Sequence, residues 1–180
     1  MMIESDIEKM MPAKEVIDIC TLLDDARVEF WVDGGWSVDA LLGQQTRPHK
    51  DLDIAVRWKD VPELRELLRA RGYKEVRQDS RWNFVLGDDK GHELDAHAFV
   101  RDEQGNVVEG VMYPLGSLYG NGVISGQPVK CVTSEYMVQF ISPWLYKLRN
   151  KDFHDVAALC EKFGIEYPEE YLRFKKLVQH

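Results

Sequence analysis

The sequence predicts an α+β domain, in which a small mixed β-sheet is flanked by helices and followed by a helical C-terminal tail. Three observations lead to this class. Apolar residues recur at helical spacing over 12–27, short alternating segments fill the middle of the chain, and helical spacing returns from Thr133 onward. The 180 residues match the size of one domain. We therefore expect a single domain over 1–180, with 133–180 as its helical C-terminal extension.

The first elements surround a pair of glycines. After the helix over 12–27, the apolar segment 30–32 predicts a short strand that enters a tight turn at Gly34-Gly35. Residues 36–42 have helical spacing again. We expect Gly43 to end this helix as a C-cap, because glycine adopts the left-handed conformation without strain.

The middle of the chain supplies most of the sheet. Alternation over 51–57 indicates a strand, and Val61 begins a helix whose first turn tolerates Pro62 and which Gly72 closes. Three more strands are expected, at 73–77, 82–86 and 93–100. The last two are joined by a segment rich in turn residues, so they should form a hairpin.

The last third turns from strand to helix. A short strand is expected around 107–108, and 113–128 is too rich in glycine for a helix, so it predicts a loop and then a hairpin ending near Cys131. Three helices complete the chain, at 133–140, 151–163 and 169–178.

Composition limits the classes of function. The formal net charge of -8, from 31 acidic and 23 basic residues, argues against a nucleic-acid partner. Cys20, Cys131 and Cys160 are too far apart for a zinc site or a disulfide framework, so buried reduced thiols are expected. No apolar run approaches the roughly 20 residues that cross a bilayer, and residues 1–6 lack the pattern of a signal peptide. We expect a cytoplasmic protein without membrane association.

Asp51 and Asp53 are the first candidate site residues. Side chains alternate along a strand, so these two carboxylates share one face while Leu52 and Ile54 point into a core. Paired carboxylates on a rigid element favour a hard cation such as Mg²⁺.

Asp95 is the third carboxylate. In the strand that follows, Glu93, Asp95 and His97 share one face, which in isolation would simply meet solvent. If this strand neighbours the Asp51–Asp53 strand, the three aspartates converge, and a divalent cation removes their mutual repulsion. Asp95 then serves as general base, as a shared metal ligand, or as both.

Gly34 and Gly35 suggest a phosphate site. Glycines allow positive φ and let a phosphate approach the N–H groups at the start of the next helix. Such a pair alone is usually only a tight turn, but a helix and then Asp51-x-Asp53 follow it here.

Several other polar residues have structural interpretations. Asp33 is a candidate hydrogen-bond partner of the glycine turn, and Asp39 is expected to face solvent. For His154 and Asp155, a pair on a helix surface is favoured over a role behind the site. Trp36 is expected in the core rather than stacked on a base.

The chain resembles a known family in several segments. These are WVDGGWSVDALLG at 31–43, QTRPHKDLD at 45–53, GVISGQPVKC at 122–131 and KDFHDV at 151–156. They are similar to the lincosamide and aminoglycoside 2''-nucleotidyltransferases of the DNA-polymerase-β-like superfamily. The resemblance extends from about residue 30 to 171 and is most specific in the first two segments. It implies the nucleotidyltransferase fold.

The resemblance also implies an activity and site roles. The activity is transfer of a nucleoside monophosphate from an NTP to a hydroxyl group, with one or two Mg²⁺ ions and release of pyrophosphate. ATP is the expected NTP. Asp51, Asp53 and Asp95 would hold metal, and Asp95 would take the proton of the attacking hydroxyl. The triphosphate would lie on Gly34 and Gly35, with three candidates to neutralise its charge: Arg47, His49 and Lys50.

The acceptor stays open at this level. A small hydroxylated molecule, an aminoglycoside or lincosamide antibiotic, is the leading hypothesis. The alternatives are a non-catalytic or antitoxin-like nucleotide-binding module of the same fold, and an adenylyltransferase acting on protein or RNA. The resemblance also leaves a homodimer open, formed through the helical tail or an edge strand.

Overall fold

The structure, a computed structural model, describes residues 10–178. The segment 1–6, from which no signal peptide is expected, lies outside these residues. The α-helices are α2 (Ala13–Asp25), α3 (Gly34–Leu42), α4 (Val61–Ala70), α5 (Ser134–Ile141), α6 (Asn150–Phe163) and α7 (Glu169–Val178), and the 3-10 helices are η1 (Trp58–Asp60) and η2 (Ser142–Lys147). The strands are β1 (Phe30–Asp33), β2 (Asp51–Arg57), β3 (Lys74–Gln78), β4 (Asn83–Gly87), β5 (Glu93–Arg101), β6 (Val107–Gly110), β7 (Gly120–Ile124) and β8 (Gln127–Cys131). The α+β class is confirmed.

One mixed sheet organises the domain. Its strand order is β3-β4-β5-β2-β1-β8-β7, and β6 adds to the free part of β5. β2 runs antiparallel to β1 and parallel to β5, while β4–β5 and β7–β8 form the two expected hairpins. The short strand expected near 107–108 is β6, which continues to Gly110.

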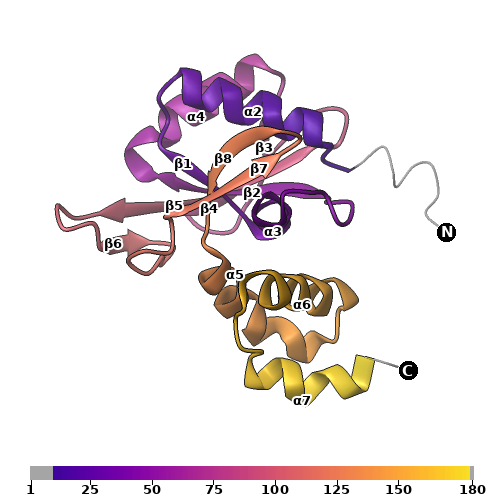
Figure 1. Cartoon of the computed structure of the whole chain (residues 1–180). Helices are drawn as coiled ribbons and strands as arrows, with labels where there is room; N and C mark the ends of the chain where they lie inside the picture. The colour runs from indigo at the N-terminus through magenta and orange to yellow at the C-terminus, as the bar shows by residue number, and fades with distance from the viewer. Residues whose placement is uncertain (1–9, 179–180) are drawn as a thin grey trace.

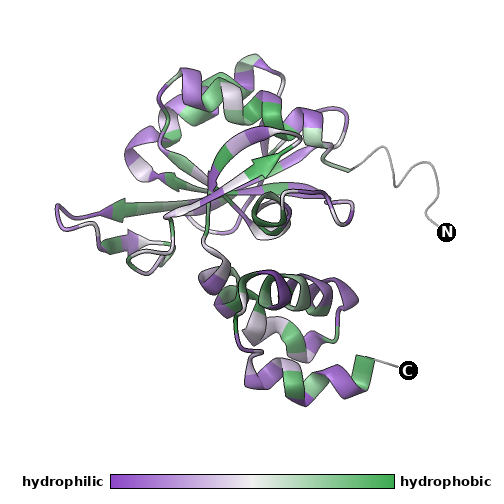
Figure 2. Cartoon of the chain, in the orientation of Figure 1, coloured by the Kyte–Doolittle hydropathy of each residue, from purple (hydrophilic) through white to green (hydrophobic). Residues whose placement is uncertain are grey.

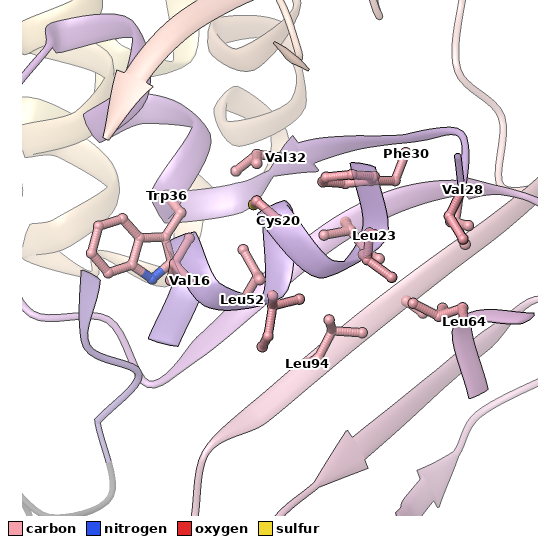
Figure 3. Close-up of a cluster of buried hydrophobic side chains, with 14 of the residues drawn as sticks. Val16, Cys20, Leu23, Val28, Phe30, Val32, Trp36, Leu52, Leu64 and Leu94 are labelled. Carbon is pink, nitrogen blue, oxygen red and sulfur yellow. The ribbon is translucent and has the colours of Figure 1, made fainter. Parts of the chain in front are cut away.

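The two faces of the sheet are covered by different helices. α2 and α4 lie on one face, and α5, α6 and α7 lie on the opposite side (Figure 1). On the α2 side, Leu52 and Ile54 are fully buried, as alternation along β2 predicts. Figure 3 shows Leu52 and Leu94 beneath Val16 of α2, inside a cluster of apolar side chains.

The second core lies between the sheet and the C-terminal helices. It joins Trp31, Ala55 and Phe99 from the strands to apolar residues of α5 and α6. Apolar and hydrophilic residues alternate along α5 and α6 (Figure 2), and the apolar ones in this core include Met137, Val138, Val156 and Leu159. The residues that share the sheet face with Trp31 and Ala55 therefore lie on the side of the helical extension.

The glycine pair begins a helix instead of standing in a separate turn. α3 starts at Gly34, two residues earlier than expected, because the Asp33 carboxylate accepts a hydrogen bond from the Gly34 N–H at 2.7 Å and caps the helix. Gly34 has φ of +58°, which L side chains rarely adopt. At the other end Gly43 has φ of +76° and is the C-cap, as predicted.

Two other expectations concern thiols and membranes. Cys20, Cys131 and Cys160 are buried and free, as expected. Over residues 10–178, none of the helices combines the length and the apolar character that a membrane crossing requires.

Candidate active site

Three adjacent strands bring acidic residues together. In the β1–β2 pairing Asp33 lies opposite Asp53, and in the β2–β5 pairing Asp53 lies opposite Asp95. The aspartates were expected to converge only if their two strands were neighbours. β2 and β5 are indeed paired, in parallel. Asp51 and Glu93 are the next pair along the same face. The carboxylates therefore line one edge of the sheet face that points toward the helical extension.

Asp53 lies at the centre of this group. One ligand atom each from Asp53, Asp95 and His97 lies within 4.8 Å of the others. Burial, and then the neighbouring charge of Asp51, raise the pKa of Asp53 to about 7. Such a carboxylate is poorly stabilised as an anion, and a bound divalent cation would favour its ionised form. The group that the structure gathers is Asp53, Asp95 and His97, and its two carboxylates suit a hard metal ion; Asp51, expected as a ligand, is not part of this group.

His97 is a central site residue to which the sequence assigned no role. Its Nδ1 lies 3.2 Å from the Tyr113 hydroxyl and 3.5 Å from Asp33, and its Nε2 lies 3.4 Å from Asp95. Burial works against the charged form, but hydrogen bonds to Asp33 and Asp95 outweigh it and raise the pKa of His97 to about 10. The Tyr113 hydroxyl in turn donates to Asp33 at 2.6 Å. The imidazole of His97 is therefore held between the carboxylates of Asp33 and Asp95.

Asp95 is oriented by donors from two other strands of the sheet. Asn83 of β4 donates to Oδ1 at 2.7 Å, and Arg77 of β3 donates to Oδ2 at 3.0 Å. Burial disfavours the Asp95 anion, yet His97, Arg77 and Asn83 together lower its pKa below the usual value. In the β4–β5 pairing Asn83 lies opposite His97, so it shares the sheet face of Asp95. The contact of Arg77 could not be predicted from the sequence, because Arg77 reaches Asp95 across an intervening strand, β4.

Gly34 lies directly against β2, the strand of Asp51 and Asp53. A Cβ at this position would fall on the Asp53 carboxylate, 2.7 Å from its Cγ. The start of α3 and the Asp53 side chain thus approach as closely as a glycine allows. This contact joins the two motifs, the glycine pair and the aspartate pair, that the sequence separates.

Gly35 rests on the side chains of Arg47 and His49. A Cβ there would lie 2.7 Å from Arg47 Nη2 and 2.7 Å from His49 Cε1. Both side chains already have carboxylate partners: Arg47 pairs with Asp155 at 2.7 Å, and His49 pairs with Asp39 at 2.5 Å. Lys50, the third candidate for the triphosphate, is exposed.

Two expectations about acidic residues were wrong. Asp39 does not face solvent: it is buried and accepts hydrogen bonds from the backbone N–H and hydroxyl of Thr46 besides its contact with His49. Asp155 does not form a surface pair with His154, because it is buried against Arg47. In both cases the partner residue comes from the loop before β2, and not from the helix that carries the aspartate. The spacing of residues within the helix therefore could not predict the burial. Trp36 lies in the core, as expected.

Comparisons with known proteins agree with this geometry. Residues 15–159 match the family model described as aminoglycoside-2''-adenylyltransferase. The chain is 28% identical to a lincosamide resistance protein of Staphylococcus haemolyticus over 152 residues, which are 81% of this chain and 92% of that protein. It is 31% identical to a 2''-aminoglycoside nucleotidyltransferase of Escherichia coli over 125 residues, 67% of each protein.

Solved structures share the fold. The lincosamide antibiotic adenylyltransferase LnuA, solved with lincomycin bound, superposes with a TM-score of 0.74 at 24% identity, covering 83% of this chain and 97% of that one. ANT(2'')-Ia in complex with adenylyl-2''-tobramycin also gives 0.74, at 21% identity, covering 93% of this chain and 96% of the other. The expected nucleotidyltransferase fold is therefore confirmed.

Proposed function

Because the chain belongs to the aminoglycoside-2''-adenylyltransferase family, we propose that this nucleotidyltransferase transfers AMP from ATP to a hydroxyl group of an aminoglycoside or lincosamide antibiotic, with release of pyrophosphate. The observation that carries the proposal is the parallel pairing of β2 with β5. It sets Asp53 opposite Asp95, directly against the start of α3 at Gly34. Phosphoryl transfer needs mainly positioning and charge neutralisation. The carboxylates of Asp53 and Asp95 would position a metal ion, and the N-terminus of α3 would position a phosphate.

Mg²⁺ is part of the proposal, with Asp51, Asp53 and Asp95 as the residues that would hold it. When bound, such an ion supplies charge neutralisation and polarisation at the phosphoryl oxygens. The acidic donor set and the raised pKa of Asp53 support this assignment.

Asp95 is the proposed general base for the acceptor hydroxyl. Each carboxylate oxygen has two lone pairs, so the hydrogen bonds from Asn83 and Arg77 leave capacity to accept a proton. His97 and the two donors fix the direction of the carboxylate, as positioning of a base requires.

The triphosphate is proposed to lie at the N-terminus of α3, on Gly34 and Gly35, where backbone N–H groups and the helix dipole favour an anion. Arg47 and His49 lie directly behind Gly35, where Arg47 adds positive charge, although each of the two is paired with a carboxylate. Lys50 is exposed and free to move toward the phosphates. A cytoplasmic location accords with three free cysteines and with the use of ATP.

The test is a direct assay. The protein is incubated with Mg²⁺, each labelled NTP, and a panel of aminoglycosides and lincosamides, and pyrophosphate release and nucleotidylated product are measured. We expect turnover with ATP and at least one of the antibiotics. Intact NTP binding without turnover on any acceptor would overturn the proposal and favour the non-catalytic nucleotide-binding module.

A further inference from the structure

A second group of charged residues lies at the opposite end of the two strands that carry the aspartates. Arg57 ends β2 and Arg101 ends β5, and both share the sheet face of Asp53 and Asp95 because side chains alternate. Lys59 follows in η1. With a rise of about 3.3 Å per residue, the four steps from Asp53 to Arg57 separate the two groups by roughly 13 Å.

Two of these three cations pair with the same carboxylate. Glu29 lies 3.2 Å from Arg57 Nη1 and 3.7 Å from Lys59 Nζ. Asp60 is close by, but its carboxylate accepts a hydrogen bond from the Glu29 N–H and forms no ion pair with a residue of the described chain. Within residues 10–178, Arg101 has neither a hydrogen bond nor an ion pair from its side chain, and its Nε is buried without an acceptor. The group thus carries uncompensated positive charge.

Arg101 is held in place by aromatic rings. Its guanidinium lies 5.2 Å from the ring centroid of Trp31 and 5.1 Å from that of Phe99. Aromatic faces stabilise a cation but do not neutralise it. Burial and the nearby charge of Arg57 lower the pKa of Arg101, yet a guanidinium stays protonated in proteins.

An open pocket adjoins these cations. It is lined by Arg57, Trp58, Lys59, Phe99 and Val100, and Arg101 follows Val100 directly. A ligand there would meet the side chains of Arg57 and Lys59, with apolar walls from Trp58, Phe99 and Val100. Arg101 lies close enough to Arg57 for the charge of Arg57 to lower its pKa.

We propose that Arg57, Lys59 and Arg101 form a binding site for a phosphate group, separate from the carboxylate cluster. The three cations outnumber the two nearby carboxylates, Glu29 and Asp60, so the group attracts an anion, and two guanidinium groups provide forked donors for the tetrahedral oxygens of a phosphate. The ligand is either free phosphate or the terminal phosphate of a small metabolite. This site does not depend on the proposed nucleotidyl transfer.

The test follows binding in Mg²⁺-free and nucleotide-free protein at constant ionic strength. Inorganic phosphate is titrated while the ¹⁵N–¹H signals of the tryptophan indoles and arginine Nε groups are recorded. We expect saturable shifts at Trp58 and Arg101. A second titration with glycerol 2-phosphate distinguishes the two sources, because tighter binding of the ester indicates a metabolite and tighter binding of inorganic phosphate indicates the free anion.

Substitution of single residues tests whether Arg101 and Lys59 bind the phosphate. Arg101→Met should weaken phosphate binding tenfold or more. Lys59→Met, at a side chain that is 63% exposed and therefore safe for folding, should weaken it several-fold. Arg173→Met removes the same charge from a guanidinium stacked on Phe174 in α7 and should change binding less than twofold. Wild-type affinity in Arg101→Met, or non-saturating shifts that sodium chloride reproduces, would overturn the proposal.

Discussion

The guanidinium of Arg47 donates two hydrogen bonds to the carboxylate of Asp155, which lies 108 residues further along the chain, at 3.1 Å from Nε and 2.7 Å from Nη2. Arg47 belongs to the loop that leads into β2, and Asp155 belongs to α6. Arg47 also lies against Gly35. One ion pair therefore ties the helical extension to the loop before the aspartate strand and to the start of α3.

Breaking this pair should destabilise the domain. Asp155 is 5% exposed, so Arg47→Met leaves an almost buried carboxylate without its partner and should lower the free energy of unfolding by about 3 kcal/mol. Urea unfolding measures the change. Arg69→Met is the matched control, because its pair with Glu66 is 72% and 63% exposed and such surface pairs contribute less than about 1 kcal/mol. Equal losses in the two variants would show that the Arg47 pair has no special role.

Asp95→Asn should abolish nucleotidyl transfer while leaving the fold intact. The amide keeps the shape of the side chain but accepts no proton, and loss of a general base typically lowers kcat by about 10²- to 10⁴-fold. Asp79→Asn is the control, since Asp79 also pairs with Arg77 but lies at the surface. Steady-state kinetics with ATP and nucleotide binding measure the two effects. Retained turnover in Asp95→Asn would exclude Asp95 as the base.

Gly34→Ala should impair the site more than an ordinary glycine replacement. The new Cβ would lie on the Asp53 carboxylate and would also force alanine to φ of +58°. Gly164→Ala separates the two effects, because Gly164 has φ of +67° and nothing within 4 Å of the added Cβ. The backbone effect alone is about 1–2 kcal/mol. Thermal unfolding and Mg²⁺ titration should show a larger stability loss and weakened metal binding in Gly34→Ala only.

The metal-free protein should lose stability as the pH rises from about 4 toward 7. The pKa of Asp53 is raised from 3.8 to about 7, so between these values the folded state binds a proton that the unfolded state has released. His97 acts in the same direction at higher pH, between 6.5 and about 10.

Thermal unfolding in EDTA across pH 4.5 to 7.5 measures this slope, which should flatten in Asp53→Asn. Because a metal ion displaces the Asp53 proton, Mg²⁺ affinity should rise about tenfold per pH unit below 7 and level off above it. A slope that is unchanged in Asp53→Asn would show that another group is responsible.

Residue spacing and capping residues were sufficient to predict most helices and strands. The bounds of β2 and α7 coincide with the segments expected from spacing, and the C-cap at Gly43 follows from glycine's conformational freedom. The common face of Asp51 and Asp53 also follows, because alternation of side chains is a property of any strand. The resemblance to the family rests on the same contiguous segments.

Contacts between distant segments required the tertiary structure. Alternation placed His97 beside Asp95, but its contacts with Asp33 and Tyr113 depend on which strand and loop lie next to β5.

The sequence by itself determined the elements, the faces of the strands and the identity of the carboxylates. Only the tertiary structure decided the partner of each charge, including the burial of Asp155 against Arg47 and the uncompensated charge of Arg101. The physical reason is that periodicity and capping act over a few residues, whereas electrostatic pairing depends on distances set by the packing of the whole chain.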